Sequence, residues 1–345
     1  MTRPLFKAPP APGDIAPDCS LRALDGETVE LRGDAVAGHI VVLLFCPKFA
    51  AAAELLDAVR ARLDGFAASG AKLFAVALEP AKVAAEQKLP FPVLLDRDGE
   101  AFHAFGASAR DQPGIIMLRP NHHVIAVLKP AGPAQVEEAL ALARRLAAER
   151  QPVAMAAHPP VLIVPDVLSP EDCRRLIKIY ETRGNVFVEP GHGDDGMTGD
   201  YKMRIPEYGR GDRIDHWIID RDTTAFIDGR LQSRLFPEIR RAFQYRVTRR
   251  ERMRIGCYTG ARGGEKHGHR DDSEPISAHR RFATSINLNT EDFAGGELRF
   301  PEFGDQRYRP ETGAAIVFSS SLLHEALHVT SGTRFVLLAF LFGEH

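Results

Sequence analysis

The residues best suited to chemistry lie in the C-terminal quarter of the chain. His269, Asp271 and His324 offer two imidazoles and one carboxylate, and Arg334 follows ten residues after His324. Two histidines and one carboxylate are a ligand set for iron(II) that leaves half of an octahedral coordination sphere open for a co-substrate and dioxygen. A guanidinium can meet a carboxylate with two parallel N–H···O bonds. The four residues therefore predict an oxidative iron site with a carboxylate clamp beside it.

Spacing indicates which neighbouring residues share this site. His269 and Asp271 are two apart, so on a strand both side chains point to one face, whereas Asp272 points to the other. His324 and His328 compete for the third ligand position. The ten-residue spacing to the arginine favours His324, which leaves His328 beside the ligands or on the surface.

Short strand patterns separated by glycine turns surround the candidate ligands. Their residues alternate between apolar and polar over much of their length, as in half-buried strands. The segments are 281–289, 295–301, 310–318, 321–324 and 329–337. Such a series predicts an antiparallel barrel or double-stranded β-helix.

The ordered motifs of this region resemble a known enzyme family. They are H-x-D, R-x-x-T, L-N, G-G-E-L-x-F-P, P-x-x-G-A, S-L-L-H and V-T-x-G-x-R. This order is similar to that of the iron(II)- and 2-oxoglutarate-dependent dioxygenases, closest to the prolyl 4-hydroxylase branch, over about residues 160–345. The resemblance implies that His269, Asp271 and His324 are the catalytic ligands of Fe(2+).

The same resemblance implies a co-substrate pocket and a reaction. Arg334 would bind the distal carboxylate of 2-oxoglutarate, and Tyr258 and Thr284 would be further cofactor-binding residues. The implied reaction uses 2-oxoglutarate and dioxygen, with ascorbate as a candidate reductant, to hydroxylate an unactivated C–H bond. Its expected substrate is a prolyl or related amino-acid unit in a peptide, protein or small molecule. Asn287 stands where prolyl hydroxylases commonly have tyrosine, which predicts a different substrate pocket from that of the collagen-type enzymes.

The N-terminal part of the chain alternates between strand-like and helix-like segments. The strand patterns cover 40–45, 72–78, 114–118 and 124–128, and helical patterns start near Ala51 and Ala134. This order resembles the thioredoxin fold, and the opening PGDIAPDCSLRALDGETVEL resembles the start of peroxiredoxins. We therefore expect a thioredoxin-like α/β domain followed by a double-stranded β-helix (jelly-roll) domain with flanking helices, an α+β chain of two domains.

The place of the peroxiredoxin redox cysteine holds alanine in this chain. Cys46 precedes the first long helix by several residues, and a free cysteine is usually a small buried residue. We interpret the domain as a redoxin without its thiol, kept for folding, docking or dimerisation. Two alternatives stay open: a thiol-dependent peroxidase that uses Cys46, and a protein-binding module that forms a homodimer or delivers a vestigial or active oxygenase to its partner.

Length and composition fit a soluble chain of two domains. The sequence has 345 residues, 44% of them hydrophobic and 26% charged. A Pro- and Ala-rich stretch predicts a linker at 151–160 between domains 1–150 and 161–345. The net charge of -2 predicts no nucleic-acid or anionic-membrane partner. The early apolar run 40–46 is too short to span a bilayer, and the four cysteines form no CxxC pair, so we expect a cytoplasmic protein.

Overall fold

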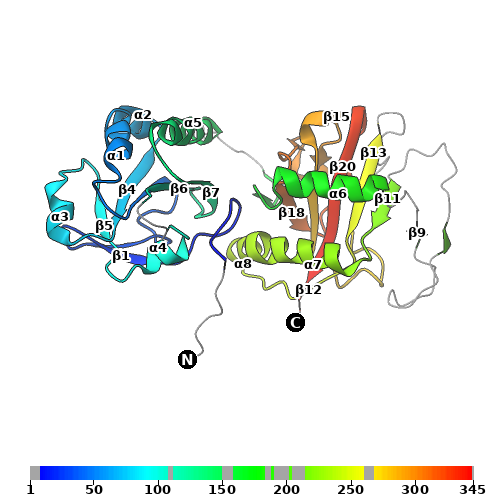
Figure 1. Ribbon diagram of the computed structural model, residues 1–345. Coiled ribbons are helices and arrows are strands. Elements are labelled where there is room, and N and C mark those ends of the chain that lie inside the picture. The colour runs from blue at the N-terminus through cyan, green and yellow to red at the C-terminus, as the bar shows by residue number, and fades with distance from the viewer. Residues whose placement is uncertain are drawn as a thin grey trace. The chain divides into compact units, whose positions relative to one another are not determined.

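The chain divides into two compact units, Met1–Ala154 and Met155–His345 (Figure 1). The computed structural model describes residues 8–107, 112–149, 158–182, 188–189, 202–203, 214–259 and 268–343. The expected linker at 151–160 lies outside the described residues apart from 158–160. Among the helices in the described ranges, none is long and apolar enough to cross a membrane.

A seven-stranded mixed sheet forms the centre of the N-terminal unit, in the order β2-β1-β5-β4-β3-β6-β7. The central strands β3, β4 and β5 run parallel, and β6 and β7 continue the sheet antiparallel. Every residue of β3 is buried, because layers cover both faces of this apolar run. The strands are β1 (Ser20–Ala23), β2 (Thr28–Glu30), β3 (Ile40–Cys46), β4 (Ala71–Ala77), β5 (Val93–Leu95), β6 (Gly114–Leu118) and β7 (Val124–Leu128).

Helices cover both faces of this sheet. Apolar side chains of α1, α2 and α5 share one core with alternate residues of β3, and α4 packs with the other residues of β3 on the opposite face. The helices are α1 (Ala53–Arg60), α2 (Leu63–Ala68), α3 (Ala81–Glu86), α4 (Glu100–Ala104) and α5 (Pro133–Glu149). This arrangement confirms the expected thioredoxin-like domain.

The C-terminal unit is a jelly roll of antiparallel strands, which confirms the second expected fold. Its major sheet has the order β11-β13-β20-β14-β18-β8, with β12 and β15 also paired to β20, and its minor sheet has the order β17-β16-β19. The strands are β8 (Val161–Val164), β9 (Val188–Glu189), β10 (Lys202–Met203), β11 (Ile214–Trp217), β12 (Arg249–Arg250), β13 (Arg254–Thr259), β14 (Phe282–Asn287), β15 (Phe293–Gly295), β16 (Leu298–Arg299), β17 (Arg307–Tyr308), β18 (Ala315–Ser319), β19 (Glu325–Ala326) and β20 (Val329–Phe342).

Alternation along the strands of the major sheet separates a helix-covered face from an inner face. On β20, Leu337, Ala339 and Leu341 share a core with the flanking helices, whereas Val336 and Phe340 pack inside the roll. The flanking helices are α6 (Pro170–Thr182), α7 (Arg221–Arg230) and α8 (Phe236–Phe243), with a π-helical turn at Leu231–Leu235 between the last two. The inner face is where the candidate ligands lie.

Cys46 ends β3 and has none of its surface exposed. Its Sγ lies 3.5 Å from the carbonyl oxygen of Leu44. Burial, and then the charge of Glu79, raises the pKa of the Cys46 thiol to about 12. The thiolate is the nucleophilic form of cysteine, and the start of α1, where a helix could lower a thiol pKa, carries alanine. The geometry therefore disfavours peroxidase chemistry at Cys46.

We predict that Cys46 of the native protein resists alkylation by iodoacetamide at pH 7 to 8, because its pKa lies far above this range and reagent cannot reach it. Peptide mass spectrometry should find Cys46 unmodified in the folded protein and alkylated after unfolding in guanidinium, which is the matched control. Sulfenylation of Cys46 in folded protein upon addition of hydrogen peroxide would contradict this prediction.

Candidate metal centre

A short backbone bridge brings the two candidate histidines together. The N–H of His269 donates to the carbonyl of His324 at 2.9 Å, and the N–H of His324 donates to the carbonyl of His269 at 3.0 Å. Two residues that exchange both bonds in this way lie directly opposite each other, with their side chains on one face. A further bond of 2.8 Å, from the N–H of Asp271 to the carbonyl of Ser320, holds the carboxylate segment along the same turn.

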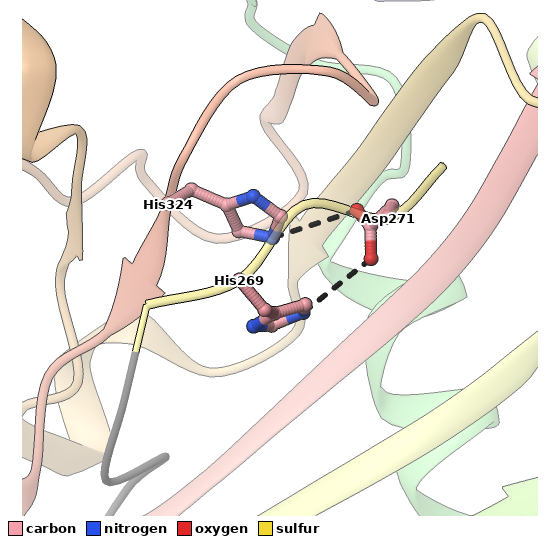
Figure 2. A group of neighbouring side chains, drawn as sticks. All are labelled: His269, Asp271 and His324. Carbon is pink, nitrogen blue, oxygen red and sulfur yellow. Dashed lines mark ion pairs between the residues drawn. The ribbon is translucent and has the colours of Figure 1, made fainter. Parts of the chain in front are cut away.

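His269, Asp271 and His324 form a compact triad (Figure 2). One ligand atom from each residue can be chosen so that all lie within 4.8 Å of one another. The Nε2 atoms of both histidines lie 3.4 Å from carboxylate oxygens of Asp271, one oxygen each. The triad has the nitrogen and oxygen donors, and the close spacing, that a transition-metal ion requires.

The surroundings of the triad keep its carboxylate ionised and one imidazole fixed. Burial alone would raise the pKa of Asp271, but the hydrogen bond from His269 and the charges of His324, His269 and Arg280 outweigh it, so the pKa lies below its ordinary value. Nδ1 of His324 lies 3.0 Å from the carbonyl oxygen of Leu322. If Nδ1 carries the proton, it donates to that carbonyl and Nε2 is left to bind a metal.

Asp272 and His328, the alternative ligands that the sequence offers, are not part of the triad. Asp272 accepts a hydrogen bond from the hydroxyl of Ser321 and is not part of the cluster of potential ligands. His328 is exposed and is not part of the cluster of potential ligands. The placements of Asp271 and His324 match the expectations from strand parity and spacing.

Arg334 lies at a second position in the pocket that contains the triad. Only 3% of its surface is exposed. Its Nε and Nη2 donate to Oδ1 of Asn287 at 3.2 and 3.0 Å, and Nη2 lies 3.4 Å from Oγ of Ser285. Tyr258 pairs with Arg334 across the sheet, and its ring centre is 5.1 Å from the guanidinium carbon. The pocket therefore has a potential metal site and a buried cation, with Tyr258 beside the cation.

Thr284 lines the pocket, but the residues of β14 that contact Arg334 are Ser285 and Asn287. On β14, Phe282 and Ile286 pack into the core under the helices, so alternation turns Thr284 toward that face as well. Its hydroxyl is buried, with no hydrogen-bond partner among the described residues. Ser285 and Asn287 point to the inner face and contact Arg334, whereas the cofactor-binding role of Thr284 stays a prediction.

The Gly295-Gly296 turn allows a close approach to β20. Both glycines have positive φ angles, +74° and +72°, which glycine adopts without strain. A Cβ atom at 295 would lie 2.2 Å from the carbonyl oxygen of His328, and one at 296 would lie 3.0 Å from Cδ of Arg334. Gly295 thus allows the close approach of the His328 backbone, and Gly296 leaves space for the Arg334 side chain.

A carboxylate on the minor-sheet side links both ligand segments. Glu302 accepts from Nη2 and Nη1 of Arg270 at 2.6 and 3.2 Å, and Arg270 lies between the ligands His269 and Asp271 in the chain. The same Glu302 accepts from the N–H of Leu323, the residue before His324, at 3.1 Å. We call this arrangement of Glu302, Arg270 and Leu323 the Glu302 brace.

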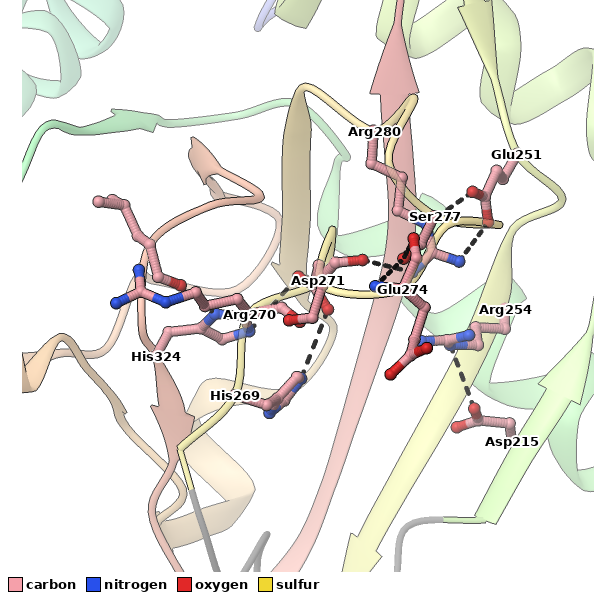
Figure 3. Close-up of polar contacts among 12 residues, drawn as sticks. Asp215, Glu251, Arg254, His269, Arg270, Asp271, Glu274, Ser277, Arg280 and His324 are labelled. Atoms are coloured by element: carbon pink, nitrogen blue, oxygen red, sulfur yellow. Dashed lines mark hydrogen bonds and ion pairs between the residues drawn. The ribbon is translucent and has the colours of Figure 1, made fainter.

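A second group of polar contacts supports Asp271 from the other side (Figure 3). Nη1 of Arg280 donates to the carbonyl of Asp271 at 2.9 Å, while its Nε and Nη2 donate to Glu251 at 2.6 and 2.9 Å. The guanidinium of Arg280 stacks 3.8 Å from the ring centre of Phe340. These contacts fix the backbone of the carboxylate ligand.

Arg254 is a pocket residue that sequence reasoning missed. It lies four residues before Tyr258 on β13, so alternation places both side chains on the inner face. Once Tyr258 is assigned to the pocket, this spacing is a signal that could have identified Arg254.

Two family models match the chain. Residues 12–127 match the AhpC/TSA family, and residues 253–342 match the 2OG-Fe(II) oxygenase superfamily. Two curated PKHD-type hydroxylases from Synechococcus sp., strains JA-2-3B'a(2-13) and JA-3-3Ab, are each 33% identical over 92 residues. That segment covers 25% of this chain and only 40% of the length of these relatives.

Solved structures resemble each part of the chain. Peroxiredoxin Q from Xanthomonas campestris is 23% identical, with 39% of this chain and 99% of that chain covered and a TM-score of 0.34. The viral collagen prolyl hydroxylase of Paramecium Bursaria Chlorella virus-1, in its 2OG complex, is 15% identical, with coverages of 53% and 96% and a TM-score of 0.38. The family matches show that the chain joins an AhpC/TSA-type domain to a 2OG-Fe(II) oxygenase domain.

Proposed function

We propose that this protein is an iron(II)- and 2-oxoglutarate-dependent hydroxylase that acts on an unactivated C–H bond of a prolyl or related amino-acid unit. The observation that carries the proposal is the placement of the triad and Arg334 in one pocket. In the balanced reaction, one atom of dioxygen enters the substrate hydroxyl and the other enters succinate, while 2-oxoglutarate loses carbon dioxide.

The triad fits iron(II) by its chemistry and surroundings. His269, Asp271 and His324 would hold the metal on one side, which is the donor set that leaves positions for a 2-oxo acid and dioxygen. When bound, iron would supply the activation of dioxygen. The low pKa of Asp271 keeps the carboxylate ready to bind a cation, and the contact of Nδ1 of His324 with Leu322 orients that ring.

Arg334 would bind the distal carboxylate of 2-oxoglutarate. Its guanidinium is held by Asn287 and Ser285, so its orientation is fixed before a ligand arrives. Tyr258 packs beside the same cation. The apolar side chains of Leu298, Phe318 and Phe340 also line the pocket and would limit the access of water to the reacting groups. These features support the use of 2-oxoglutarate as co-substrate.

The substrate class rests on the motif resemblance and on the PKHD-type hydroxylases that match part of the chain. Asn287 contacts Arg334 directly. We therefore expect that asparagine at this position, in place of the tyrosine common in prolyl hydroxylases, affects the co-substrate end of the pocket.

The proposal predicts that protein loaded with iron(II) without oxygen binds one iron per chain and converts 2-oxoglutarate to succinate when oxygen is admitted. Replacement of both His269 and Asp271 by alanine should abolish iron binding and succinate formation, because two of three ligands are lost. His328→Ala is the matched control, since it removes an exposed histidine outside the triad. Succinate formation that survives the double replacement would refute the proposed site.

Arg334→Lys should raise the KM for 2-oxoglutarate about 10- to 100-fold, because charge-assisted hydrogen bonds contribute about 1.5–3 kcal/mol and lysine lacks the planar fork. Steady-state succinate assays at several 2-oxoglutarate concentrations measure the change. The exposed arginine of β17 supplies the control variant Arg307→Lys, which should keep the wild-type KM. An unchanged KM in Arg334→Lys would place the co-substrate carboxylate elsewhere.

Loss of the Glu302 brace should weaken metal binding. We expect Glu302→Ala to lower the affinity for cobalt(II) about 10-fold or more, as for other residues that orient metal ligands. Glu302→Gln should recover part of the loss, because its amide oxygen can still accept from Leu323. Absorption titrations with cobalt(II) measure both effects, and the exposed Glu311→Ala is the control. Equal cobalt affinity in Glu302→Ala and wild type would show that the brace does not position the ligands.

A further inference from the structure

Asn289 lies where the backbone pairing of β20 changes partner. β20 pairs with β15 up to Gly332 and with β14 from Val336 onward, so Arg334 lies between these two ladders. Asn289 follows β14 and precedes a short helical turn at Thr290–Asp292. Asparagine often caps the first turn of a helix, but this side chain, in a residue that is 8% exposed, bonds to β20 instead.

The Asn289 amide holds the main chain on both sides of Arg334. Its Nδ2 donates to the carbonyl of Thr333 at 2.8 Å, and its Oδ1 accepts from the N–H of Phe335 at 2.9 Å. These peptide groups belong to the two residues that flank Arg334. The bridge needs a donor and an acceptor on one planar group, which an amide has and an ionised carboxylate lacks.

Asn287 holds the other end of Arg334. Its Oδ1 accepts from Nε and Nη2 of the guanidinium, while its Nδ2 donates to the carbonyl of Pro310 at 3.0 Å. The bond to Pro310 determines which way this amide faces. Leu288, between the two asparagines, donates its N–H to the main chain of β20 at 2.9 Å. Three consecutive residues therefore hold both the backbone and the guanidinium of Arg334.

Position is what the Asn289 bridge contributes to the site. A binding group must be held within about 0.5 Å of its productive place by the residues around it. Without the amide, the N–H of Phe335 and the carbonyl of Thr333, both on half-buried residues, lose the partners they have in this structure. Polar backbone groups in such surroundings seek new partners, so β20 would shift or admit water at Arg334.

We propose that Asn289 is a positioning residue for the co-substrate, which sets the place of Arg334 and so the strength with which the distal carboxylate is bound. Asn289 is not among the residues that line the pocket, so it acts through Arg334. This inference rests on the proposed function, because that proposal assigns the distal carboxylate of 2-oxoglutarate to Arg334.

Calorimetric titrations with two 2-oxo acids test the proposal. 2-Oxoglutarate carries the distal carboxylate, and 2-oxopentanoate has the same chain length without it. The titrations use the full chain loaded with manganese(II), as wild type and as the variants Asn289→Ala and Asn289→Ser. Serine suits the start of a helical turn as well as asparagine does, so Asn289→Ser keeps the local turn, but its short side chain cannot bridge two peptide groups.

The preference for the distal carboxylate is the quantity that decides. We expect wild type to bind 2-oxoglutarate at least about tenfold more tightly than 2-oxopentanoate, the size of a charge-assisted hydrogen bond. Both variants should lose most of this preference, with 2-oxoglutarate affinity about tenfold lower and 2-oxopentanoate affinity changed less than about threefold. Manganese(II) affinity should stay at the wild-type value, because the triad is not altered.

Arg309→Met is the matched control, because Arg309 donates to the carbonyls of Thr290 and Phe293 in the same segment rather than to β20. It should keep the wild-type preference. A preference that survives in both Asn289 variants, an equal loss in Arg309→Met, or a loss of manganese(II) and both acids together would overturn the proposal and leave the proposed function in place. Equal binding of the two acids by wild type would refute the proposed role of Arg334 and this inference with it.

Hydrogen exchange of the metal-free full chain tests the structural step separately. Peptide mass spectrometry should find faster exchange at Phe335 in Asn289→Ala than in wild type, because this N–H loses its acceptor. Exchange at Phe335 in Arg309→Met should match that of wild type. Unchanged exchange in Asn289→Ala would overturn the proposal.

Discussion

The mutual hydrogen bonds between the backbones of His269 and His324 are the constraint on which the candidate site depends. They set two side chains from distant segments opposite each other on one face, and the bond from Asp271 to Ser320 adds the carboxylate. The jelly roll makes this meeting possible, because β18 and β19 flank the turn that carries His324. The Glu302 brace and the contacts of Arg280 then fix the same segments from two sides.

The two units of the chain differ in their capacity for chemistry. In the N-terminal unit, burial of Cys46 and alanine at the start of α1 leave a redoxin fold without an activated thiol at the expected place. Within the described parts of the chain, the triad is the group of side chains suited to hold a metal. We infer that the oxidative chemistry belongs to the C-terminal unit, and docking or dimerisation by the N-terminal unit stays a prediction.

Sequence was sufficient for the fold classes and for much of the pocket. Strand parity separated Asp271 from Asp272, and spacing separated His324 from His328, because both depend on local geometry. A motif match does not reveal which face of β14 turns inward, because that depends on pairing with β20 and on the core under the helices, so Ser285 and Asn287 were not predicted as contacts of Arg334. Arg254 was missed although its spacing from Tyr258 on β13 is a local signal, whereas its ion pair with Asp215 joins two strands whose adjacency no local pattern encodes.

A crystal structure of the protein with iron and 2-oxoglutarate, prepared without oxygen, tests the central claim most directly. Anomalous diffraction at the iron edge should place one iron bonded to His269, Asp271 and His324, with the distal carboxylate of 2-oxoglutarate on Arg334. Iron bound by other side chains, or a co-substrate carboxylate away from Arg334, would contradict the proposed centre.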